Sequence, residues 1–205
     1  AAVMLDSVTN SKKAVVTHDF LPDLVILDPD LVSEVPPKVL KTTVADALSH
    51  AIEGYVSLID NPLMNTFAEQ AVSIIYRYRH QFSNDNWSSE MLSELQQAAM
   101  FAGWVQNHCI VGLSHAIAHQ LGTFNIGHGL ANGLLMPAVI NFNYREHTAA
   151  TKYEQLIYKS GLPNKEALLE LFEVLVGEQK TDMHFSEQQL TTIAENALLD
   201  PAAKS

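Results

Sequence analysis

Apolar residues recur at helical spacing over most of this chain, from Pro36-Pro37 to near its end. Residues 38–57 are apolar almost all round, which is typical of a helix buried among other helices. The same spacing, together with N-cap residue types, predicts further helices that begin near Asn61, Ser88, Gly112, Gly129, Ala149, Asn164 and Ser186. Pro137 predicts a kink in the helix that begins near Gly129. The sequence therefore predicts a mainly α fold, with an all-helical domain over residues 36–205.

The first 35 residues have a different pattern. Two short apolar runs, Ala14–Thr17 and Leu24–Leu27, are bounded by turn-forming residues and predict two strands. Two strands alone do not form a stable sheet. We therefore expect the strands in residues 1–35 to pair with a segment outside this sequence or to form a small flap.

Composition and charge narrow the function classes. Hydrophobic residues make up 47% of the chain, enough for a buried core, and the net charge is −11. An acidic chain is a poor partner for nucleic acid or for an anionic membrane surface, because both are bound through Lys and Arg. Residues 98–121 are apolar enough to be considered as a membrane span, but polar side chains interrupt them. They predict a buried helical pair instead.

The cysteine content and the N-terminal residues give an expectation for the cellular compartment. Cys109 is the only cysteine, so neither an intrachain disulfide nor a cysteine zinc site can form. Ala1–Asp6 lacks the features of a secretory signal. These observations predict a reducing, cytoplasmic location.

The chemistry is concentrated in a repeated pentapeptide. Leu-Ser-His-Ala-Ile occurs around His50 and again around His115. Asp46 precedes His50 by four residues, and His119 follows His115 by four, so each pair lies on one face of a helix. Either pair could bind a divalent metal. Either could equally be a polar stripe facing water, in the first case together with Glu53.

A third histidine segment favours the metal. His128 stands between Gly127 and Gly129 at a predicted helix start, and glycines permit close backbone approach and unusual torsions. Three imidazoles and a carboxylate from three short segments would form a borderline-soft metal site without sulfur. We expect His108 to be a core histidine and the remaining candidates to lie at the surface, namely His80, His147 and His184. The chain has no nucleotide-binding glycine motif of its own.

These segments resemble a known family. Asp46–Tyr55 (DALSHAIEGY) resembles the metal-binding helix of the iron-containing alcohol dehydrogenases. Gly112–Gly122 (GLSHAIAHQLG), followed by His128–Asn132 (HGLAN), resembles their second signature, and the likeness extends over about residues 12–201. The chain departs from the family pattern at Val44-Ala45, and at Gly127, where proline is common.

The resemblance implies both fold and residue roles, and it implies that residues 1–35 are a strand-containing remnant of a nucleotide-binding α/β domain. The family combines an N-terminal nucleotide-binding α/β domain with a C-terminal helical metal domain of the dehydroquinate synthase-like fold, and the cofactor lies between them. His119 matches a non-ligand histidine proposed to relay a proton, and Lys12 matches a lysine near the cofactor. The implied metal ligands are Asp46, His50, His115 and His128.

The implied activity is reversible hydride transfer between NAD(P) and a primary alcohol or aldehyde. Fe²⁺ is the metal that the resemblance favours, with Zn²⁺ as the alternative. We expect this chain alone to be inactive, because the resemblance assigns nucleotide binding to the other domain. Two alternatives stay open: a polyol dehydrogenase or dehydroquinate synthase-like enzyme, and a non-catalytic metal-binding helical domain. A small-molecule substrate is the expected partner, and a homodimer stays open.

Overall fold

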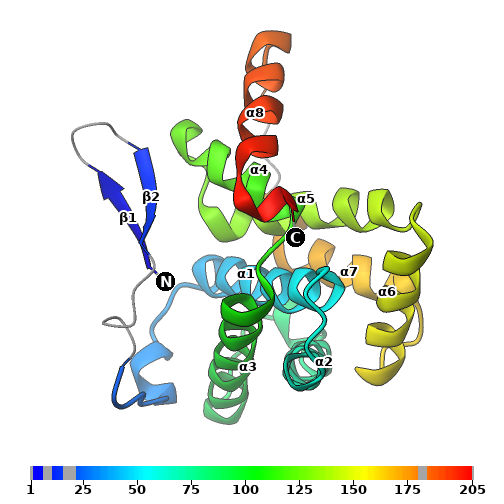
Figure 1. Ribbon diagram of the computed structural model, residues 1–205. Coiled ribbons are helices and arrows are strands. Elements are labelled where there is room, and N and C mark those ends of the chain that lie inside the picture. The colour runs from blue at the N-terminus through cyan, green and yellow to red at the C-terminus, as the bar shows by residue number, and fades with distance from the viewer. Residues whose placement is uncertain (1, 7–10, 16–21, 180–183, 205) are drawn as a thin grey trace.

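The computed structural model describes residues 2–6, 11–15, 22–179 and 184–204, with side chains from residue 22 onward. Within these ranges the chain is mainly helical (Figure 1). The helices are α1 (Pro37–Val56), α2 (Pro62–Arg77), α3 (Ser89–Cys109), α4 (Leu113–Leu121), α5 (His128–Asn143), α6 (His147–Lys159), α7 (Lys165–Val176) and α8 (Glu187–Leu199).

The helix starts agree with the capping residues in the sequence. The side chains of Asn61, Ser88 and Asn164 each accept a hydrogen bond from a backbone N–H in the first turn of α2, α3 and α7. Ser186 and Gln189 form a capping box at the start of α8. The mainly α fold class predicted from the sequence is confirmed. Helix α5 continues through Pro137.

The strand prediction is only partly correct. β1 (Ala2–Asp6) and β2 (Ser11–Val15) form an antiparallel pair with Val3 opposite Ala14, so β2 includes Ala14 and Val15 of the predicted Ala14–Thr17 strand, whose last two residues lie outside the described residues. Leu24–Leu27 forms no strand, and its side chains are exposed. Among the described residues no third strand joins β1 and β2 to offer this run a hydrogen-bonding edge. Apolar composition alone therefore misidentified it.

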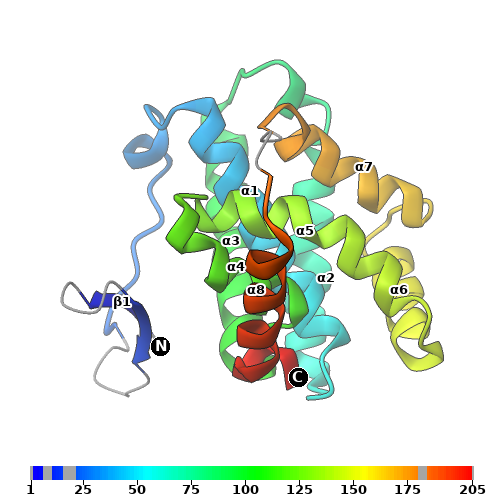
Figure 2. The same ribbon diagram turned by 90° about the horizontal axis from the view of Figure 1, so that it is seen from above.

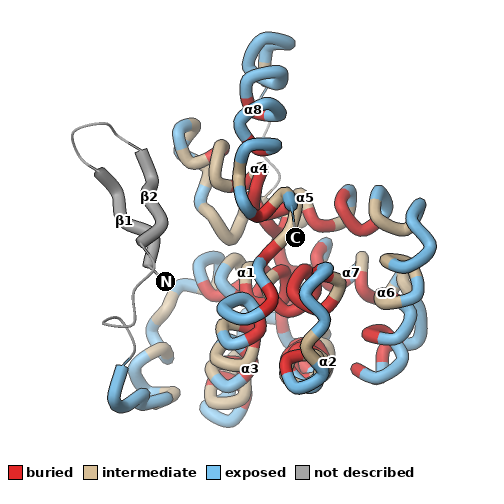
Figure 3. Tube along the Cα trace, in the orientation of Figure 1, coloured by how far each residue is buried: buried red, intermediate tan, exposed pale blue. Residues whose placement is uncertain are grey.

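The core is built around α1. This helix packs against α2, α3 and α5, as two perpendicular views show (Figures 1 and 2). Leu48, Ala51 and Ile52 are fully buried in its middle, and the buried positions concentrate where the helices meet (Figure 3). A burial of this extent on several faces explains why the sequence of α1 is apolar almost all round.

A smaller apolar cluster holds the end of the chain against the body. Ala116 in α4 belongs to one buried cluster with Ala197 in α8 and Ala202 in the 3₁₀ turn Pro201–Lys204. The C-terminal segment thus lies next to α4, which contacts both α5 and α8.

The apolar residues 98–121 form the second half of α3, a short connection and α4. In the described part of the chain no helix is long and apolar enough to cross a membrane. The prediction of a helical pair for this stretch is thus confirmed.

Candidate metal centre

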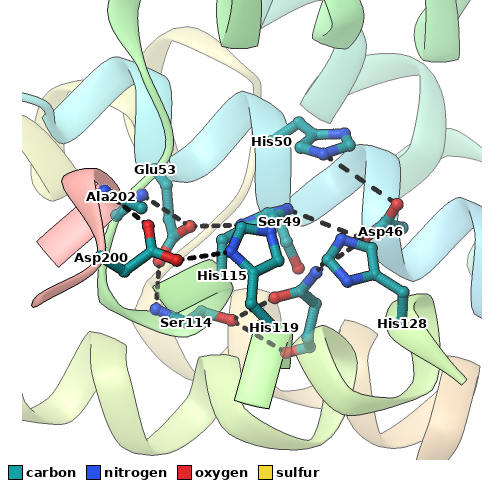
Figure 4. A network of polar contacts seen from close by, with 12 residues as sticks. Asp46, Ser49, His50, Glu53, Ser114, His115, His119, His128, Asp200 and Ala202 are labelled. Atoms are coloured by element: carbon teal, nitrogen blue, oxygen red, sulfur yellow. Dashed lines mark hydrogen bonds and ion pairs between the residues drawn. The ribbon is translucent and has the colours of Figure 1, made fainter. Parts of the chain in front are cut away.

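Three helices bring four candidate ligands together. Asp46 and His50 lie one turn apart on α1, His115 lies in the first turn of α4, and His128 is the first residue of α5. Each side chain offers one ligand atom, and these atoms all lie within 4.8 Å of one another. Figure 4 shows the four side chains converging from the separate helices.

The spacing around Asp46 fits a cation better than direct contacts. Asp46 Oδ1 lies 3.6 Å from His128 Nε2 and 3.8 Å from His115 Nε2, and Oδ2 lies 4.0 Å from His50 Nε2. These distances are too long for hydrogen bonds. A divalent ion with ligand distances of roughly 2.0–2.2 Å would bridge such atoms. The buried Nε2 of His115 also lacks a hydrogen-bond partner among the described residues, so the donor set suits a metal.

The imidazoles are packed against one another. The rings of His50 and His115 stack with centroids 4.6 Å apart, and the ring of His128 lies 5.3 Å from that of His115. Burial, with a further contribution from neighbouring His115, lowers the pKa of His50 to about 3, although Asp46 acts in the opposite direction. His50 is therefore neutral near pH 7, which is the form that binds metals.

A glycine permits the approach of α5 to α1. A Cβ on Gly129 would lie 2.3 Å from the carbonyl oxygen of Thr42, so any larger residue would push the two helices apart. Gly127 has φ −59° and open space around its Cα, so the expected unusual torsion is not found there. Close approach, at Gly129 alone, is the physical reason for glycine beside His128.

His119 lies beside the cluster and has a partner of its own. Its Nδ1 is 2.8 Å from Asp200 Oδ2, and its ring stacks on that of His128 at 5.4 Å. The side chain is 29% exposed, against 1% for His115. His119 is not among the four converging ligand residues. Lys12 lies in β2, but its side chain is outside the described residues.

Three polar residues at the site have no assigned role in the sequence analysis. Glu53 is 2% exposed and contacts His115, so the alternative of a water-facing stripe is wrong for this residue. The amide of Asn132 donates to Asp46 Oδ1 at 2.8 Å and lies 3.1 Å from His128 Nε2. Glu53 and Asn132 lie inside segments that carry the family resemblance, and this was a signal by which the sequence could have identified them. The sequence offered no such signal for Asp200.

The remaining histidines of the described residues lie away from the cluster. His80, His147 and His184 are exposed, as predicted. The prediction of a core position for His108 is wrong, because it lies on the solvent side of the last turn of α3, with Nδ1 2.8 Å from Trp104 O. His18 lies outside the described residues.

Known proteins share this sequence pattern. The family model for the C-terminal part of the Fe-containing alcohol dehydrogenases matches residues 40–204. The 1-propanol dehydrogenase PduQ of Citrobacter freundii is 37% identical over 154 residues, covering 75% of this chain and 42% of that protein. The NADPH-dependent butanol dehydrogenase of Clostridium saccharobutylicum is 31% identical over 178 residues, covering 85% of this chain and 45% of that protein.

Solved structures share the fold. A 1,3-propanediol oxidoreductase is 27% identical with a TM-score of 0.80, over 99% of this chain and 56% of that one. A sulfoacetaldehyde reductase from Bifidobacterium kashiwanohense matches 98% of this chain and 54% of that one with a TM-score of 0.86, and at 23% identity it shows the fold alone. The chain spans about half the length of these relatives. It belongs to the Fe-containing alcohol dehydrogenase family and matches the C-terminal, helical part of that family.

Proposed function

We propose that this chain supplies the metal-binding part of a nicotinamide-dependent alcohol or aldehyde oxidoreductase. Asp46, His50, His115 and His128 would hold one divalent cation. The observation that carries the proposal is the convergence of their four ligand atoms to within 4.8 Å, from three separate helices. A bound cation would act as a Lewis acid and favour the alkoxide form of an alcohol.

The charge of the ligand set suits that task. One carboxylate and three neutral imidazoles leave a doubly charged cation with a net charge of about +1. Asp46 is 23% exposed and His128 31%, whereas His115 is buried. We therefore infer that substrate reaches the cluster from the side of Asp46 and His128.

His119 would act on the proton. Its ring stacks on His128, and its Nδ1 is held by Asp200, so its Nε2 is the nitrogen left to exchange a proton with the substrate oxygen or with water. The partial exposure of His119 gives that proton a path to solvent. A relay of this kind needs hydrogen-bond reach and no metal contact.

The nicotinamide cofactor remains part of the proposal. Two curated relatives are named for NADPH-dependent and NAD-dependent dehydrogenases, of butanol and methanol, so both cofactors stay open. The relatives are about twice as long as their matched parts, which supports cofactor binding with residues outside this sequence. The division at residues 35 and 36, a role for Lys12 and a cytoplasmic location stay predictions.

Metal analysis tests the proposal directly. The purified protein, loaded separately with Fe²⁺ and Zn²⁺, should retain about one ion per chain, with Zn²⁺ the more tightly bound. Asp46→Ala and His128→Ala should lose the ion, whereas His80→Ala, at an exposed histidine, should keep it. Equal metal content in all four proteins would contradict the proposal.

Activity tests the division of labour. We expect the 205-residue chain alone to oxidise no primary alcohol with either nicotinamide. A version fused to the nucleotide-binding half of a relative should gain turnover, and that turnover should disappear in Asp46→Ala. Turnover by the 205-residue chain alone would show that it binds the cofactor unaided.

A further inference from the structure

We propose that Glu53 is a positioning residue that fixes the tautomer of His115, so that the Nε2 lone pair of His115 faces the metal position. The inference deepens the proposed function and rests on it for the identity of the ligand cluster. It concerns a residue on the same helix as Asp46 and His50 that is not itself a ligand.

Glu53 is a buried carboxylate with a complete set of donors. Its Oε1 accepts from the Ser114 backbone N–H at 2.6 Å, and its Oε2 accepts from that of Gly112 at 2.9 Å. Both amides belong to the N-terminal turn of α4, where the helix dipole favours a negative charge. Burial of this carboxylate is offset by these charge-assisted hydrogen bonds.

Gly112 makes this approach of the two segments possible. A Cβ at this position would lie 3.1 Å from Glu53 Oε1 and 3.3 Å from its Cδ, which is tighter than ordinary packing. The first turn of α4 is thus held directly over the carboxylate, in line with the polar network in Figure 4. His115 follows Ser114 in the sequence, and its ring lies against the same carboxylate.

The remaining contact decides where the His115 proton lies. His115 Nδ1 is 2.6 Å from Glu53 Oε2, and both residues are almost fully buried. A carboxylate has no hydrogen to donate, so Glu53 accepts from the ring nitrogen as it does from the two backbone N–H groups. The shared proton therefore lies on Nδ1 and is donated to Glu53.

A neutral imidazole carries one ring proton, so Nδ1–H leaves Nε2 with a lone pair. That nitrogen is buried, has no hydrogen-bond partner among the described residues and lies 3.8 Å from Asp46 Oδ1. The opposite tautomer would place a hydrogen at the metal position and prevent binding. Glu53 thus selects the form of His115 that can be a ligand, as carboxylates behind metal-binding histidines commonly do.

Glu53→Gln is the sharpest test, because it conserves shape and replaces one acceptor by a donor. With its NH₂ in place of Oε2, glutamine would oppose the Gly112 N–H. It would also donate to His115 Nδ1 and so favour the Nε2–H tautomer. With its NH₂ in place of Oε1, it would oppose Ser114 N–H. Either orientation leaves a buried donor unpaired. Glu69→Gln is the matched control, since the partners of Glu69 are Tyr55 and Lys159.

Zn²⁺ affinity, measured by competition with a chromophoric chelator, should fall roughly 10- to 100-fold in Glu53→Gln and stay unchanged in Glu69→Gln. Circular dichroism establishes that each variant is folded. Wild-type Zn²⁺ affinity in a folded Glu53→Gln whose His115 carries its ring proton on Nε2 would overturn the inference.

Proton-nitrogen correlation spectra of the ring nitrogens in the metal-free wild type give a second, independent reading. We expect His115 to carry its proton on Nδ1, and a proton on Nε2 would overturn the inference even if Glu53→Gln failed to fold. A wild type that bound no Zn²⁺ would contradict the proposed function instead, and the tautomer would still be measured.

Discussion

His115 and His119 lie one turn apart on α4, yet their surroundings differ in every respect that matters for chemistry. His115 lies where Glu53 of α1 meets the start of α4. Its side chain is 1% exposed and contacts the buried Glu53 carboxylate. His119 lies where α4 meets the C-terminal segment. Its side chain is 29% exposed and contacts Asp200. Spacing places both histidines on one face, but the neighbouring segments give them different surroundings, which suit the different roles proposed for them.

The same comparison applies to the carboxylates. Glu53 reaches His115 from the central helix of the core, whereas Asp200 follows α8 and is connected to the body through a small alanine cluster. Asp200 is also held by the Ala202 N–H at 2.9 Å. A ligand needs the rigid position, and a proton relay needs access to solvent, so each histidine lies where its proposed task is possible.

Replacing each histidine in turn should reveal the largest difference between the two regions, which is a difference in metal content. His115→Ala should abolish metal binding, because it removes a ligand from the centre of the cluster, whereas His119→Ala should retain the metal. Elemental analysis of the two purified variants decides the matter. If His119→Ala loses the metal as completely as His115→Ala, the two regions do not differ as proposed.

Turnover should then depend on His119. In a complete enzyme that contains the nucleotide-binding half, His119→Ala should lower kcat by roughly 10²- to 10⁴-fold with the metal still bound. Asp200→Asn should give a smaller loss, because it keeps the histidine and weakens only its support. Steady-state kinetics with metal analysis on the same samples test this, and an unchanged kcat in His119→Ala would contradict the relay.

These roles show what the sequence could and could not predict. Helix positions were accessible, because caps such as Asn61 and Ser186 act on neighbouring residues. The family resemblance, and not spacing, pointed to the four residues whose ligand atoms converge in the structure, because spacing left His115 and His119 equivalent. The contact between His119 and Asp200 was not accessible, since it joins residues 81 positions apart by the packing of α8.

Glu53 shows the same limit within one helix. It looked like part of a water-facing stripe, and it is buried because α4 begins directly over it. Leu24–Leu27 is the converse case, an apolar run that is exposed and forms no strand. Local pattern gave the elements, but burial depends on neighbours that only the fold supplies.

The approach of α5 to α1 gives a prediction with a paired control. Gly129→Ala should destabilise the protein by about 1–3 kcal/mol and weaken metal binding, because the new methyl group meets Thr42 O at 2.3 Å. Gly127→Ala, two residues away in open space, should be nearly neutral. Urea unfolding of both variants measures this, and equal stabilities would show that the contact is not tight.

The buried position of His50 predicts a pH dependence of the metal-free protein. Its pKa is about 3 in the folded protein against 6.5 for an ordinary histidine, so below about pH 6.5 the unfolded chain binds the extra proton and folding becomes less favourable. Stability should fall as the pH decreases from about 6.5 toward 3.

Between about pH 7.5 and pH 5, this single group should contribute a loss of about 2 kcal/mol. His50→Gln should lose less stability than wild type over that interval by about this amount, and His80→Gln should behave as wild type. Urea unfolding at the two pH values measures the difference. A wild type that loses no more than His50→Gln would show that His50 is not held neutral.

An anomalous-scattering crystal structure of the Zn²⁺-loaded protein tests the central claim most directly. The account predicts one strong peak at roughly 2.0–2.2 Å from Asp46, His50, His115 and His128, with His115 binding through Nε2 and His119 outside bonding distance. A peak bonded to His119, or no peak within the cluster, would contradict it.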